Sequence, residues 1–194
     1  MSMRREHDLL GDRDVPAAAY YGVHTLRAVE NFPISATPIS IYPDLIVALA
    51  SIKLAAAKTN CELKLLDQAR ADAIVAAAEE IRAGRLHQEF VVDVIQGGAG
   101  TSTNMNANEV IANRALELLG RARGDYHFLH PNEHVNMSQS TNDVYPTALK
   151  LAAYAGIMRL VEAMAVLRLA FEGKSEEFKD IIKMGRTQLQ DAVP

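Results

Sequence analysis

The sequence of 194 residues has little cysteine, no tryptophan and few aromatic residues of any kind (6%). Its single cysteine, Cys61, excludes a disulfide framework and a thiolate metal site. It has no run of 18 apolar residues and no signal-like leader, which argues against a membrane helix or a secretion signal. With 20 basic and 24 acidic residues, the net charge is −4, so no basic surface argues for nucleic acid. We therefore expect a cytoplasmic protein that binds neither nucleic acid nor membranes.

The sequence does show a clear helical periodicity of apolar residues. Apolar side chains recur at helical spacing in four stretches, and strand patterns are nearly absent. Prolines interrupt the first 42 residues, which we expect to be irregular. The predicted helices cover residues 45–63, 67–83, 105–119 and 143 to about 172. This pattern predicts a mainly α fold that buries its long helix in a bundle.

Two domains are predicted from these stretches. Residues 1–140 would form an N-terminal, mostly helical domain, and residues 141–194 would begin a central helical-bundle domain. The chain stops directly after a polar loop, without a closing element. We therefore expect the sequence to be cut, and the second domain to be incomplete.

Two polar runs, Gly100–Asn106 and Asn136–Asp143, are rich in hydroxyl and carboxamide groups and carry a single charge, that of Asp143. Each lies next to a helical stretch. Such neutral donors suit a small dianion, because a helix N-terminus presents free N–H groups and the positive end of its dipole. A pair of capped loops is the alternative, although capping uses only one or two such residues.

The position of Pro146 fixes where the long helix begins. Proline is tolerated only in the first turn of a helix, so the helix must start near residues 142–145, with Ser140 and Thr141 just before it. The first polar run predicts a similar site, in which Thr101 precedes a helix that begins near residues 104–106.

Other motifs are weaker. The glycines of Gln96–Gly100 match neither the dinucleotide fingerprint nor a phosphate loop, so nucleotide binding is not expected. His130 and His134 lack a third ligand at matching spacing for a zinc site. A role in structural hydrogen bonding is therefore the better interpretation. Asp143 could act as a base, but helix capping is favoured at its position.

Taken together, the motifs resemble the aspartase/fumarase superfamily, in its class II fumarase and aspartate ammonia-lyase branch. The resemblance extends over most of the chain and keeps the family's order. Ala99, Thr141 and Gln188 stand where fumarases generally have serine, serine and histidine, which favours the ammonia-lyases. The matching segments are Tyr20–Ala28, Gly97–Asn106, His130–Asn136, Ser138–Asp143 and Gly185–Ala192.

The resemblance implies a lyase that reversibly eliminates ammonia from L-aspartate to give fumarate, with no organic cofactor and with no metal ligands among its site residues. It implies a homotetramer whose active sites are shared between subunits. A fumarate hydratase, another lyase of the superfamily, or a non-enzymatic helical assembly module are the alternatives.

The resemblance also assigns the substrate-binding residues. Thr101, Ser140 and Thr141 would hold the carboxylate that gains charge, and Asn142 with Thr187–Gln188 would lie near the amino group and the other carboxylate. The family's serine base is expected beyond residue 194, so this chain alone should be inactive.

Overall fold

The computed structural model describes residues 2–96 and 98–192 and is mainly α-helical, as predicted. The chain divides into two compact units, one up to Tyr154 and one from Ala155 onward. The division between residues 140 and 141 that the sequence suggests stays a prediction. Gly97, which belongs to one of the family-like segments, lies outside the described residues, as do Met1, Val193 and Pro194.

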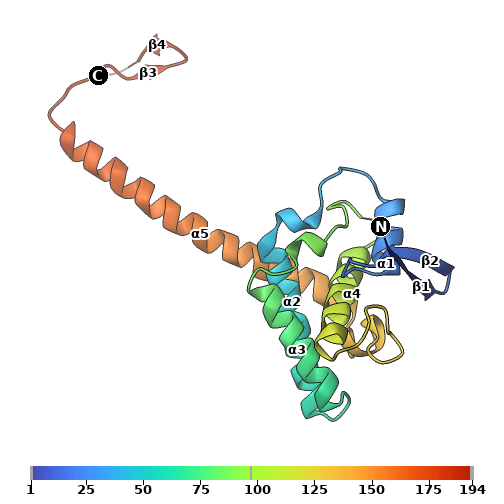
Figure 1. Ribbon diagram of the computed structural model, residues 1–194. Coiled ribbons are helices and arrows are strands. Elements are labelled where there is room, and N and C mark those ends of the chain that lie inside the picture. Colours follow the sequence, from blue (N-terminus) through green and yellow to red (C-terminus); the bar gives the residue numbers. More distant parts are fainter. Residues whose placement is uncertain (1, 97, 193–194) are drawn as a thin grey trace. The chain divides into compact units, whose positions relative to one another are not determined.

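Three helices form the core of the first unit (Figure 1): α2 (Pro43–Glu62), α3 (Gln68–Arg82) and α4 (Thr101–Leu118). α3 packs against both α2 and α4. Each contributes fully buried aliphatic side chains, which are Ile46 and Leu49, Ile74 and Ile81, and Ile111 and Leu116. Burial of such side chains is the main force that holds the helices together.

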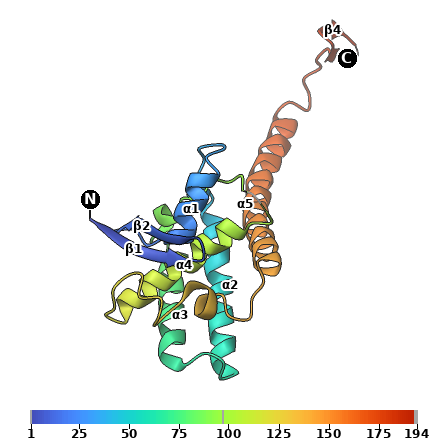
Figure 2. The ribbon, with the colours of Figure 1, turned by 90° about the vertical axis from the view of Figure 1, so that its right-hand side faces the viewer.

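The first 42 residues are not irregular, and this expectation was wrong. They form an antiparallel hairpin of β1 (Met3–Asp8) and β2 (Gly11–Pro16), helix α1 (Val23–Asn31) and a short turn, η1 (Ile39–Ile41). The hairpin lies beside α1 (Figure 2). The prolines do not prevent this structure, because Pro16 ends β2 and the others lie outside the elements.

A carboxylate from α4 fixes the start of α1. The side chain of Glu109 is fully buried and accepts hydrogen bonds from the backbone N–H groups of Gly22 (2.8 Å), His24 (2.9 Å) and Thr25 (3.0 Å). A Cβ at Gly22 would lie 2.4 Å from the hydroxyl of Tyr126, so only glycine allows this approach. The family-like segment around Gly22 therefore joins α1 to α4.

Helix α5 (Thr141–Glu177) is the longest element. Its first turns belong to the first unit, where Val144 and Ala148 are buried. The second unit contains the rest of α5 and a small hairpin of β3 (Arg186–Thr187) and β4 (Gln190–Asp191). None of the helices among residues 2–96 and 98–192 is long and apolar enough to cross a membrane.

Two short turns complete the first unit, η2 (His87–Glu89) and the single π-helical turn η3 (Pro131–Val135). The latter leads directly into the second polar run. The four predicted helices are all present.

Candidate functional site

The first polar run forms the N-terminal turn of α4. Gly100 precedes the helix with a φ of +84°, a left-handed conformation that favours glycine. The helix begins at Thr101 itself, so the predicted start near residues 104–106 was wrong. The sequence pattern missed this turn because its residues are polar, whereas the apolar periodicity begins only later. The first backbone N–H groups of this helix have no carbonyl partner within the helix, as at any helix start.

The second polar run leads into α5. Ser140 precedes the helix as predicted, whereas Thr141 is its first residue. The Ser140 carbonyl accepts hydrogen bonds from the backbone N–H groups of Asp143 (3.1 Å) and Val144 (3.0 Å), and its hydroxyl accepts one from Asn142 (3.3 Å). The capping position therefore belongs to Ser140, and the expectation that Asp143 caps this helix was wrong. Asp143 lies in the first turn instead.

The two helix N-termini meet in the first unit. An added Cβ at Gly100 would lie 2.3 Å from Cγ of Tyr145 in α5, so the backbone of the α4 start rests directly against this ring. One turn along α4, the side-chain nitrogen of Asn104 lies 3.0 Å from the hydroxyl oxygen of Thr141. The two polar runs thus converge, and the positive ends of both helix dipoles lie close to each other.

A buried hydrogen-bond network lies beneath this meeting point. Asn104 also donates to Oδ1 of Asn136, at 3.1 Å. The same oxygen accepts a hydrogen bond from Nζ of Lys53 in α2, at 2.7 Å. Lys53 is fully buried, and burial lowers the pKa of its ammonium to about 7. No carboxylate of the described residues forms an ion pair with it.

The proposed ligand-binding residues differ in where they lie. Thr101, Ser140 and Asn142 are exposed and Thr141 is half-buried, so all four belong to an accessible part of the first unit. Thr187 and Gln188 are exposed in the β3–β4 hairpin of the second unit, where Gln188 has a φ of +48°. The first unit therefore brings four of the six residues together.

His130, just before η3, and His134, within it, both accept backbone hydrogen bonds, as the structural interpretation expects. Nδ1 of His134 accepts a hydrogen bond from the His130 backbone N–H at 2.8 Å. Nδ1 of His130 accepts from the backbone N–H groups of Asn132 (3.1 Å) and Glu133 (3.3 Å). Among the described residues no cluster of three or more potential metal-ligating side chains is present.

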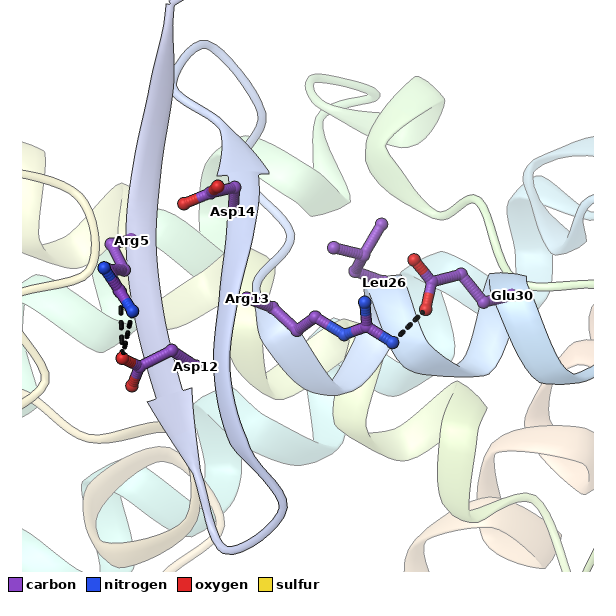
Figure 3. Close-up of a pocket in the computed structure, with 6 residues that line it drawn as sticks. All are labelled: Arg5, Asp12, Arg13, Asp14, Leu26 and Glu30. Carbon is purple, nitrogen blue, oxygen red and sulfur yellow. Dashed lines mark hydrogen bonds and ion pairs between the residues drawn. The ribbon is translucent and has the colours of Figure 1, made fainter.

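A separate pocket of about 320 Å³ lies between the β1–β2 hairpin and α1 (Figure 3). Its arginines do not favour a dianion, because each faces a carboxylate. Arg5 forms an ion pair with Asp12 at 2.7 Å, and Arg13 forms one with Glu30 at 3.2 Å. Asp14 adds a further acidic group to the lining. The meeting point of α4 and α5 is therefore the better candidate for an anion site.

Sequence reasoning did not identify Lys53, Asn104 or Asn136 as supports of the site. The signal for Lys53 was available, because Leu49 and Ala57 are one turn away on either side and belong to the buried stripe of α2. A lysine inside such a stripe needs a polar partner. Its partner, Asn136, could not be identified without the fold.

Known proteins are similar to this chain over its whole length. Residues 11–194 match the protein family described as Lyase. The chain belongs to this family. It is 58% identical over 193 residues to the aspartate ammonia-lyase of Pseudomonas canavaninivorans, a match that covers all of this chain and 41% of the relative.

Solved structures give the same fold. A fumarate lyase:delta crystallin from Brucella melitensis has a TM-score of 0.96 and 58% sequence identity, and this chain covers 45% of it. A class II fumarase from Schistosoma mansoni has a TM-score of 0.90 and 39% identity, with 40% of its chain covered. All of this chain is matched in both cases. The chain thus spans less than half the length of these relatives.

Proposed function

We propose that this chain provides the substrate-binding half of an aspartate ammonia-lyase active site. The reaction is the reversible elimination of ammonia from L-aspartate to give fumarate. One observation carries the proposal: the N-termini of α4 and α5 meet, with neutral hydroxyl and amide donors around them. The 58% identity to an aspartate ammonia-lyase supports the choice of reaction.

The chemistry calls for such donors. Removal of the proton next to the β-carboxylate gives an aci-carboxylate with additional negative charge, and preorganised donors stabilise that charge as it develops. Thr101, Ser140 and Thr141 would hold this carboxylate. Asn142, Thr187 and Gln188 would lie near the amino group and the other carboxylate, and the serine base would come from the remaining part of the enzyme.

The full enzyme on this proposal is a cytoplasmic homotetramer that needs no cofactor and shares each active site between subunits. The domain limits suggested by the sequence, 1–140 and 141–194, are part of the same proposal. Fumarate hydratase is the second candidate, because the fold also matches a class II fumarase closely.

The test uses an enzyme in which this chain replaces the matching residues of the Pseudomonas canavaninivorans aspartate ammonia-lyase, hereafter the complemented enzyme. Fumarate formation is followed by its ultraviolet absorbance with L-aspartate and, separately, with L-malate. Turnover of L-aspartate alone is expected. Preference for L-malate would favour the hydratase, and a folded tetramer without either activity would favour a structural module.

A further inference from the structure

A fully buried lysine that pairs with no carboxylate is destabilising, and among the residues that the structure describes Lys53 has no such partner. An apolar residue of similar length would fill the same space in the α2 stripe at lower cost. Buried ionisable groups of this kind are more frequent at functional sites than elsewhere. The question is therefore what the amino group of Lys53 does at the N-termini of α4 and α5.

The amino group fixes the orientation of Asn136. Lys53 donates to Oδ1 of Asn136 at 2.7 Å, while Nδ2 of Asn136 donates to the backbone carbonyl of Gln139 at 3.1 Å. Reversing the carboxamide would place its NH₂ group against the ammonium and its oxygen against a carbonyl. Asn136 is therefore held in one orientation from both sides.

The orientation of Asn136 sets that of Asn104. Because Oδ1 of Asn136 is an acceptor, Asn104 must turn its NH₂ group toward it, and Nδ2 of Asn104 lies 3.1 Å from this oxygen. The second hydrogen of this NH₂ group is donated to the Thr141 hydroxyl at 3.0 Å. Asn104 itself is only 1% exposed, so water does not compete for these bonds.

The hydrogen bonds from Lys53 through Asn136 and Asn104 end at the hydroxyl of Thr141. A hydroxyl has one hydrogen and two lone pairs. Since its oxygen already accepts a hydrogen bond from Asn104, the hydrogen must point elsewhere, and it is free to be donated to a ligand. We propose that Lys53 is a positioning residue that acts through Asn136 and Asn104 to present the Thr141 hydroxyl as a donor to the substrate carboxylate.

This inference rests on the proposed function, because Thr141 is assigned to the substrate there. The lowered pKa of Lys53 agrees with it, since either protonation state retains an N–H to donate to Asn136. The network also gives a role to Asn104 and Asn136, which the proposed function does not assign to the substrate.

The test compares Lys53→Met with Lys58→Met in the complemented enzyme. Lys58 is on the same helix but exposed, which makes it a matched control. Lys53→Met should lower kcat/KM for L-aspartate roughly tenfold, while its unfolding temperature stays the same or rises because the buried charge is gone. Lys58→Met should change neither quantity.

A double-mutant cycle separates positioning from a structural role. In a Thr141→Val background the hydroxyl is absent, so Lys53→Met should cost less than about twofold there. Asn104→Ala interrupts the same path and should show the same coupling to Thr141→Val, which keeps the test available if Lys53→Met does not fold.

The outcomes are distinct. Additive effects in both cycles, or unchanged kcat/KM in Lys53→Met, would overturn the role of Lys53 and leave the proposed function standing. Absence of fumarate formation by the unmodified complemented enzyme would overturn the proposed function and this inference with it.

Discussion

The hydroxyl of Thr141 receives a hydrogen bond from Asn104 and that of Thr101 is exposed, so both can donate to a carboxylate. If each acts as an oxyanion donor, Thr141→Val and Thr101→Ala should each lower kcat/KM of the complemented enzyme roughly 10²–10³-fold. The stability of Thr101→Ala should change by no more than about 0.5 kcal/mol, because the side chain is exposed.

Thr59→Val provides the control, since Thr59 is an exposed threonine on α2. Steady-state kinetics and chemical unfolding of the same preparations give both quantities. Parallel losses of activity and stability in the Thr101 and Thr141 variants would show that these residues support the fold and would remove their proposed role.

Glu109 supports the fold rather than the ligand site. Its carboxylate accepts from three backbone N–H groups at the start of α1. Glu109→Gln replaces one acceptor oxygen by an NH₂ group, which leaves buried donors without a partner and should cost roughly 2–4 kcal/mol of unfolding free energy. Glu62→Gln, at an exposed position, should cost almost nothing. Urea unfolding of both variants measures this. Equal unfolding free energies for Glu109→Gln and Glu62→Gln would contradict the role of Glu109 at the start of α1.

At the scale of elements, the contact between the starts of α4 and α5 depends on Gly100. Gly100→Ala should reduce both stability and kcat/KM, because its Cβ would lie 2.3 Å from the Tyr145 ring and push the two helix N-termini apart. Gly120 is the matched control: its φ of +72° is also left-handed, but an added Cβ there meets no atom within 4 Å.

Gly120→Ala should therefore show only the backbone strain, about 1 kcal/mol, and retain its kinetic constants. Both variants are compared in the complemented enzyme by thermal unfolding and by fumarate formation. If Gly100→Ala behaves like Gly120→Ala, the close approach of the helices is not needed for activity.

The elements also show what the sequence could and could not predict. The helices were predictable because apolar side chains at a period of 3.6 residues must share a buried face. The β1–β2 hairpin was missed because its residues are mostly charged and only Glu6 and Val15 are buried. The start of α4 was placed too late because a polar first turn carries no apolar period.

The candidate site, too, was predictable only in part. The types of donor around Thr101 and Thr141 were visible in the polar runs, since few other arrangements require so many neutral donors. Their convergence was not visible, because it depends on contacts between residues far apart in sequence, such as Asn104 with Thr141 and Lys53 with Asn136. Such contacts arise only when α2, α4, α5 and the segment that follows η3 pack together.

At the scale of the whole molecule, Lys53 links stability to pH. Burial lowers its pKa to about 7 in the folded protein, from an ordinary 10.5. Between these two pH values the unfolded chain binds more protons than the folded one, so the contribution of Lys53 to stability rises with pH in this window. The slope is at most about 1.4 kcal/mol per pH unit.

Lys53→Met removes this dependence. The variant should exceed the unmodified complemented enzyme in unfolding free energy most strongly below pH 7, and the difference should shrink as the pH rises toward 10. Taking the difference cancels the titration of groups that both proteins share. A difference that stays constant over this pH range would show that Lys53 has the same pKa in the folded and unfolded states.

The second unit determines how the polypeptide of residues 1–194 behaves by itself. From Ala155 onward α5 exposes large apolar side chains on more than one face: Ile157, Leu160, Met164, Leu167 and Phe171 follow one stripe, and Met158, Val166 and Leu169 lie outside it. A helix with apolar residues on more than one face is stable in water only when other helices cover it. The polypeptide of residues 1–194 should therefore self-associate at micromolar concentration, which light scattering or sedimentation would detect.

The same polypeptide should form no fumarate from L-aspartate. The proton on carbon is weakly acidic, so its removal needs a positioned base together with a completed set of donors. The residues assigned to the ligand here are neutral hydroxyls and amides, and the proposal places the serine base in the remaining part of the enzyme. The complemented enzyme, assayed in parallel, is the positive control. Sustained turnover by residues 1–194 alone would place a base within this chain, and Asp143, exposed in the first turn of α5, would be the first residue to replace.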